Sequence, residues 1–134
     1  MLKEMTRSVR LMVLIAVTGA ASAPPAMAQS YDDAGCWSVA HGCAQVRQRW
    51  DDDSDTVTIT TVTNRCGGRI AIRLCNEVER DDSHEWICHD YALADRDSRD
   101  QTTFFSTDEW KLQSIGSRDS GTDSICRRRG GPGS

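Results

Sequence analysis

Large apolar side chains are scarce in this sequence. Residues 29–134 contain only 5 Val, 6 Ile, 3 Leu and 2 Phe, which is less than the roughly 20% below which chains are usually disordered. Burial of such side chains alone therefore does not explain a stable fold. The same stretch holds four tryptophans and six cysteines, and disulfides typically contribute about 2–4 kcal/mol each. We expect folding to depend on oxidation.

Long hydrophobic runs are also missing. The longest, from Leu11 to Ala23, has 13 residues, short of the roughly 20 that a membrane-spanning helix needs. Basic residues precede it, and the small-x-small pattern Ala26-Met27-Ala28, which signal peptidase recognises, follows it. This arrangement predicts a signal peptide over residues 1–28 and a periplasmic or secreted protein without a membrane anchor, starting at Gln29.

Positive charge is limited. Of the 16 basic and 20 acidic residues, three and one lie in the expected signal peptide, so residues 29–134 carry a net charge of −6 with His neutral. An acidic chain of this kind is not expected to bind nucleic acid. The one basic cluster, Arg127-Arg128-Arg129, precedes a Gly-rich end, which predicts a flexible tail over residues 127–134.

Catalytic motifs are absent. The chain has no Cys-x-x-Cys pair and no Gly-x-Ser-x-Gly elbow, so neither thiol redox chemistry nor an esterase-type nucleophile is indicated. Asp51-x-Asp53-x-Asp55 begins like a calcium-binding loop. However, Thr56 and Val62 occupy the positions of its glycine and its closing glutamate. Calcium is therefore not predicted there.

Zinc binding is the other metal hypothesis, since His84, Cys88 and His89 lie close together in the sequence. Adjacent residues of a strand face opposite ways, so Cys88 and His89 do not converge easily on one ion. A disulfide for Cys88 and an exposed surface for the histidines are the better interpretation. No metal and no cofactor is expected.

The cysteines are the most informative feature that is present. All six follow the expected signal peptide, and an even number in an exported chain predicts three disulfides. A pairing of Cys66 with Cys75 is excluded if residues 69–75 form a straight strand, which would separate them by about 25 Å. We favour Cys36–Cys43 as a local bridge, expect Cys88 to pair with Cys66 or Cys75, and expect Cys126 to tie the C-terminus to the sheet.

The pattern of the chain predicts a single, mainly β domain over residues 29–126: a small antiparallel sheet or sandwich of about five strands, stapled by disulfides. The clearest strand is the β-branched run at residues 56–63. Turn residues at 64–68 suggest that it forms a hairpin with the next strand. A short helix is expected over Ala40–Trp50, and loops at 76–83, 95–101 and 116–124. The remaining strands are expected at residues 70–75, 85–91, 102–106 and 109–115.

Aromatic residues are the candidates for ligand binding. Trp37, Trp86, Tyr91 and Trp110 can stack on sugar rings if they lie on an exposed sheet face. The alternative, which we favour for most of the tryptophans, Trp50 included, is that they form the core in place of the missing aliphatic residues. The degree to which the indoles are exposed distinguishes the two interpretations.

The stretch from Asn64-Arg65-Cys66-Gly67-Gly68-Arg69-Ile70 through Cys75, followed by Trp86-x-Cys88, resembles a pattern in small cysteine-rich exported bacterial proteins of unassigned function. The resemblance covers about 25 residues. It implies export and a disulfide-stapled β fold, and it carries over no functional residue.

Three functions remain open. The first is a non-catalytic binding or structural module with a protein or carbohydrate ligand, which binds through a sheet face or the loops at 76–84 and 94–101. The second is a small inhibitor or immunity-like protein whose acidic loops block a basic active site. The third is a small hydrolase or metal enzyme, which requires His84 or His89 beside a carboxylate in a pocket. The oligomeric state is left open.

Overall fold

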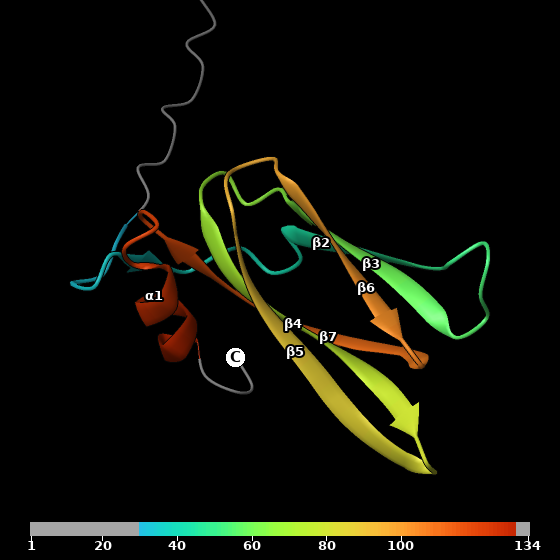
Figure 1. Cartoon of the computed structure of the whole chain (residues 1–134). Helices are drawn as coiled ribbons and strands as arrows, with labels where there is room; N and C mark the ends of the chain where they lie inside the picture. Colours follow the sequence, from blue (N-terminus) through green and yellow to red (C-terminus); the bar gives the residue numbers. More distant parts are fainter. Residues whose placement is uncertain (1–29, 131–134) are drawn as a thin grey trace, which may run out of the picture.

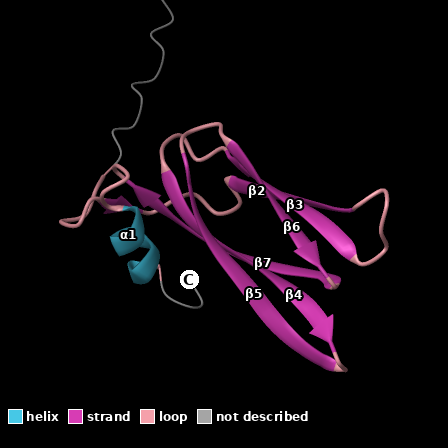
Figure 2. Ribbon diagram, viewed as in Figure 1, coloured by secondary structure: helices cyan, strands magenta, loops and turns pink. Residues whose placement is uncertain are grey.

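Two antiparallel β-sheets and one short helix make up the computed structural model, which describes residues 30–130 (Figure 1). The expected signal peptide and the last four residues lie outside this range. Figure 2 shows the helix beside one end of the sheets. The four-stranded sheet has the order β1 (Cys36–Trp37), β7 (Ser106–Ser117), β4 (Ile70–Arg80), β5 (Ser83–Leu93), and the three-stranded sheet β2 (Ala44–Trp50), β3 (Val57–Asn64), β6 (Ser98–Phe104); α1 is Asp123–Arg129.

Alternation along the central strands builds the small apolar core. Every second residue of β4, from Ile70 to Leu74, is buried and faces the other sheet, and Val62 of β3 faces it from the opposite layer. Trp37 joins this cluster and lies against Gly116, where an added Cβ would come within 2.1 Å of the indole. Trp37 is therefore a core residue.

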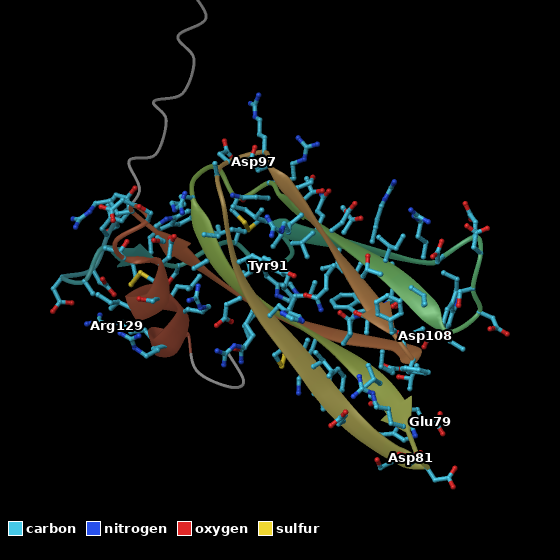
Figure 3. All side chains as sticks on the ribbon, viewed as in Figure 1. Glu79, Asp81, Tyr91, Asp97, Asp108 and Arg129 are labelled. Atoms are coloured by element: carbon cyan, nitrogen blue, oxygen red, sulfur yellow. A yellow bond between two sulfur atoms is a disulfide. The ribbon has the colours of Figure 1, made fainter. Side chains whose placement is uncertain are left out.

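Polar side chains fill the rest of the space between the sheets. Asn76 donates to Thr60 Oγ1 (3.0 Å), and its own Oδ1 accepts from Gln101 Nε2 (2.7 Å). Gln101 in turn accepts from the Tyr91 hydroxyl (3.0 Å), and Figure 3 shows Tyr91 between the layers. Because these buried groups are paired with one another, the sheets can pack here without apolar residues.

The expected hairpin between residues 56–63 and 70–75 is wrong, because β3 and β4 belong to different sheets. The segment between them crosses from one layer to the other, and Asn64 Nδ2 holds the crossing by hydrogen bonds to the carbonyls of Gly68, Leu93 and Ala94. The tight hairpin joins β4 to β5 instead.

Several expected boundaries also differ. Ala40–Trp50 is not a helix: β2 occupies its second half, with alternate residues facing inward and outward. The expected loop at 76–83 is mostly the end of β4, and the turn to β5 is Asp81-Asp82, both with positive φ. The expected loop at 95–101 ends early, since β6 begins at Ser98. The expected loop at 116–124 is shorter, because β7 extends to Ser117 and α1 begins at Asp123. The strand expected at 102–106 is the end of β6 and the first residue of β7, and the strands expected at 85–91 and 109–115 lie within β5 and β7.

Three disulfides staple the fold, as predicted, but the pairing is only partly as expected. The bridges are Cys36–Cys126, Cys43–Cys66 and Cys75–Cys88, so Cys36–Cys43 is wrong. Cys88 does pair with Cys75, and Cys126 ties the C-terminal helix to β1, the edge strand of the four-stranded sheet. Bridges of this number are typical of proteins from an oxidising, extracellular environment.

The expected basic tail begins inside α1. Arg127 and Arg129 lie in the last turn of the helix and form ion pairs with Asp90 (3.1 Å) and Asp32 (2.8 Å). At the other end of α1, Asp123 binds Arg69 through two hydrogen bonds. Burial raises the pKa of Asp123, but hydrogen bonds from Arg69 and Ser117 outweigh it and leave that pKa below its usual value. These contacts, with the Cys126 bridge, attach the helix to the sheet.

Candidate functional site

The four aromatic candidates do not share a face. Trp37 is 8% exposed, and Tyr91 is half-buried with its hydroxyl in the interlayer network. Trp86 and Trp110 are 41% and 40% exposed. Trp86 lies opposite Glu77 on the outer face of the four-stranded sheet, whereas Trp110 lies opposite Asn76 on its inner face. A sugar-stacking platform that combines Trp86, Tyr91 and Trp110 is therefore not formed.

Trp110 lines a groove along the open side of the sandwich, between β7 of one sheet and β2 of the other. We call it the edge groove; its volume is about 800 Å³. One wall is β7 and the last residues of the helix, and the other is the segment 38–42 with the start of β2. Its lining consists of Ser38, Val39, Ala40, His41, Gly42, Ala44, Gln45, Val46, Trp110, Leu112, Ser114, Ile115, Arg129 and Gly130.

The interior of the edge groove is mostly apolar. Val39, Val46 and Leu112 are partly buried and pack against the core, so they form a continuous apolar surface with it. Arg129 contributes a guanidinium to the lining. It donates hydrogen bonds to Asp32 and Asp33, and these carboxylates raise the pKa of Arg129. The groove thus offers apolar contact and few groups for charge recognition.

Two disulfides hold one wall of this groove in place. The segment 38–42 runs between Cys36, which is bonded to Cys126, and Cys43, which is bonded to Cys66. Both ends of the wall are therefore covalently tied, one to the helix and the other to the crossing between the sheets. The groove is formed before any ligand enters it.

The outer face of the four-stranded sheet holds the other exposed tryptophan. The Lys111 ammonium lies 4.1 Å from the ring centroid of Trp86, a cation–π contact that occupies one face of the indole. Glu77 accepts hydrogen bonds from both His84 and Thr107, and the bond to Glu77 raises the pKa of His84. Trp86 is already engaged by a cation of this chain.

The polar set at Glu77 does not have the order of a catalytic triad. In a triad the histidine lies between the nucleophile and the carboxylate, because it takes the proton of the one and is oriented by the other. Here Glu77 lies in the middle, and Thr107 and His84 each contact it separately. No histidine therefore contacts the Thr107 hydroxyl among these three residues.

The metal hypotheses find no support in the residues that the structure describes. Cys88 is bonded to Cys75, and no group of three His, Cys, Asp or Glu side chains within residues 30–130 is placed to hold an ion. Asp51, Asp53 and Asp55 line a shallow hollow beside Trp50, on the loop between β2 and β3.

Sequence reasoning missed the groove residues other than Trp110 and one row of arginines. Arg47 and Arg49 project from the outer face of β2, and Arg65 continues their row beside a floor of Thr61 and Thr63. The alternation of Ala44–Trp50, with Val46 inward and the two arginines outward, is visible in the sequence as a period of two and was interpreted there as a helix.

Within residues 30–130, none of the helical structure has the length and apolarity required for crossing a membrane. In the edge groove, the exposed Trp110 and the apolar lining lie next to the side of β7 that β1 leaves largely uncovered. No family model, curated protein or solved structure matches this chain.

Proposed function

We propose that this protein is a non-catalytic binding module that holds its ligand in the edge groove beside Trp110. The observation that carries the proposal is the groove itself: an open, mainly apolar hollow with an exposed indole, whose one wall is tied at both ends by disulfides. Concave apolar sites with a few polar groups are the usual form of ligand sites. A wall fixed before binding reduces the ordering that the ligand must impose.

The arrangement of titratable groups supports binding over turnover. Within residues 30–130, the His–Glu–Thr set at Glu77 lies on the outer face, away from the edge groove, and does not have the order of a catalytic triad. The groove lining contains His41 and no carboxylate. The acidic loop at Asp51–Asp55 is a solvated surface loop on this proposal.

A comparison of two matched tryptophan variants tests the binding site. Wild-type protein, W110A and W86A are exposed to a glycan array and to a display library of random seven-residue peptides. We expect ligands that bind wild type and W86A equally and bind W110A at least tenfold more weakly. Ligands that depend on Trp86 alone, or no ligand at all, would show that the edge groove is not the site.

We also propose that the protein is exported, with residues 1–28 removed as a signal peptide. The three disulfides support an oxidising compartment, periplasmic or extracellular. The intact mass of the protein expressed with its own N-terminus measures this. A chain that starts at Gln29 and gains six hydrogens on reduction is expected, and a full-length chain or free thiols would contradict it.

A further inference from the structure

The open side of β7 presents unpaired backbone to the edge groove. On that side β1 pairs only with Gly116 and Ser117, and the Ser106 N–H donates to Thr56 O (2.9 Å), so among the described residues no strand pairs with the open side at Trp110, Leu112 and Ser114. Edge strands of this kind can accept another strand, because a row of peptide N–H and C=O groups faces outward.

The register of the strands shows which peptide groups face the groove. The Ser117 N–H donates to Arg69 O, on the β4 side, and the Arg118 N–H donates to Gly35 O, on the β1 side. Hydrogen-bonding direction alternates along an antiparallel strand, and the pairing with β4 is regular from Gly116 to Trp110. The peptide groups of Ser114, Leu112 and Trp110 therefore point to the open edge.

These residues are also the ones whose side chains point inward. Leu112 is opposite Leu74 and Trp110 opposite Asn76, both buried positions of β4. A strand added along β7 would continue the same pleat, so every second side chain of it would enter the space between the sheets, facing Val39 and Val46 across the groove. A strand added to β7 in a single register can therefore form the backbone hydrogen bonds and the apolar contacts at the same time.

From this geometry we propose that the ligand is an extended polypeptide that adds to the open edge of β7 as a strand, with apolar side chains at alternate positions inside the edge groove. The proposal rests on the proposed function and names the class of its ligand. About six residues, or ~20 Å of strand, span the edge from Trp110 to Ile115. Strand addition gains affinity from main-chain hydrogen bonds and specificity from pockets for alternate side chains.

The composition of the two edges favours β7 over β2. β2 also borders the groove, but Arg47 and Arg49 project from it, and charges on an edge strand discourage pairing. Between Trp110 and Ile115 the one charged residue is Lys111, whose ammonium is drawn over the sheet face to Trp86. A peptide fits better than a sugar here, because only a peptide can pair along the outward-facing backbone groups of Trp110, Leu112 and Ser114 and continue the sheet.

Amide hydrogen exchange of the free protein tests the edge without any ligand. The amides of Leu112 and Ser114 are expected to exchange fast, whereas those of Lys111 and Ile115, which face β4, are expected to exchange at least tenfold more slowly. Equal, strong protection of all four would mean that the edge is covered and would overturn the proposal.

The decisive experiment modifies the peptide, so that folding of the protein is not in question. A seven-residue peptide enriched on wild type and lost on W110A is resynthesised with N-methyl groups on alternate residues, in two complementary sets. Strand addition predicts that one set binds at least tenfold more weakly while the other keeps its affinity, because only alternate N–H groups face β7. Protection of the Leu112 and Ser114 amides should accompany binding.

Other results separate this proposal from the proposed function. Equal affinity of both N-methylated sets would mean that the groove binds peptides by side chains alone. Glycans that bind through Trp110 with no enriched peptide would also overturn strand addition, while the groove would remain the site. Protection of Val46 and Gln48 instead of Leu112 and Ser114 would move the added strand to β2. Concentration-dependent dimerisation with protection of the β7 edge would identify a second copy of this chain as the occupant and overturn the peptide proposal.

Discussion

Removing the disulfides one at a time tests what stabilises this domain. In the loop-entropy treatment a disulfide acts by restricting the unfolded chain, and its effect grows with the length of chain that it closes. Cys36–Cys126 spans a sequence separation of 90, and Cys75–Cys88 one of 13. The expected losses in the free energy of unfolding are about 4.6 kcal/mol for C36A/C126A and about 3 kcal/mol for C75A/C88A. C43A/C66A, with a separation of 23, is expected to lose about 3.4 kcal/mol.

Urea unfolding followed by far-UV circular dichroism measures these differences under non-reducing conditions. The two extreme variants should differ by about 1.6 kcal/mol, which corresponds to roughly 6–13 °C in Tm for a domain of this size. Reduction of all three bridges should unfold the protein, because their combined effect is comparable with the ~5–15 kcal/mol that stabilises a typical domain. The reasoning would be refuted if C75A/C88A were the less stable of the two, or if the fully reduced chain kept its cooperative transition.

Three further predictions concern the interior and the helix. G116A should lose about 1–3 kcal/mol or more in unfolding free energy, since the new Cβ would overlap the Trp37 indole; an unchanged urea midpoint would contradict this packing. N76A should lose about 1–3 kcal/mol because it leaves buried hydrogen-bonding partners unpaired, whereas a stability equal to wild type would mean that water replaces the amide. The pKa of Asp123 is lowered in the folded state. Its ion pair with Arg69 therefore stabilises the protein at pH values above the ordinary carboxyl pKa of 3.8, and this stabilisation is lost as the pH falls through the folded-state pKa. D123N should flatten that part of the pH–stability profile, and a profile identical to wild type would show that the pair is not coupled to folding.

The sequence predicts individual strands better than their partners. The run Thr-Val-Thr-Ile-Thr-Thr-Val-Thr at 56–63 restricts χ1 and alternates, so its strand is evident from local chemistry. Its partner is not, because Asn64-Arg65-Cys66-Gly67-Gly68 has the composition of a hairpin turn while it serves as a crossing between sheets. What decides the outcome is the set of hydrogen bonds from the Asn64 side chain to Leu93 and Ala94, about thirty residues away in the sequence.

Disulfide pairing was predictable only where geometry restricts it. Cys75 and Cys88 are directly opposite on neighbouring strands. Because the backbone N–H and C=O groups of Cys75 point toward β7, Cys75 and Cys88 form a non-hydrogen-bonded pair, in which the side chains lie close together. The exclusion of Cys66–Cys75 is consistent with this pairing. The bridge from Cys36 to Cys126 joins the two ends of the domain, and no local pattern indicates it.

Of the residues that line the edge groove, the sequence predicted one. Trp110 was expected at a ligand-binding surface, but Trp37 is core and Trp86 lies on the opposite face. The groove depends on which strand remains without a neighbour, and that is a property of the sheet order rather than of any segment. The expectation that most of the indoles replace aliphatic core is wrong, because it holds for Trp37 alone and Trp50, Trp86 and Trp110 are exposed. The interlayer hydrogen bonds of Asn76 and Gln101 supply a further part of the interior that composition did not suggest.

The open groove and the scarcity of apolar side chains are related. A sandwich that relied on burial alone would lose stability by leaving one side open, because partly exposed residues such as Val46 and Leu112 gain little from the core. Here the bridges Cys36–Cys126 and Cys43–Cys66 fix both ends of the wall that faces these residues. The stability of the domain therefore does not depend on closing this side of the sandwich. A small acidic domain can keep a free strand edge and an apolar groove in water, since covalent bonds hold the frame that a larger core would otherwise have to hold.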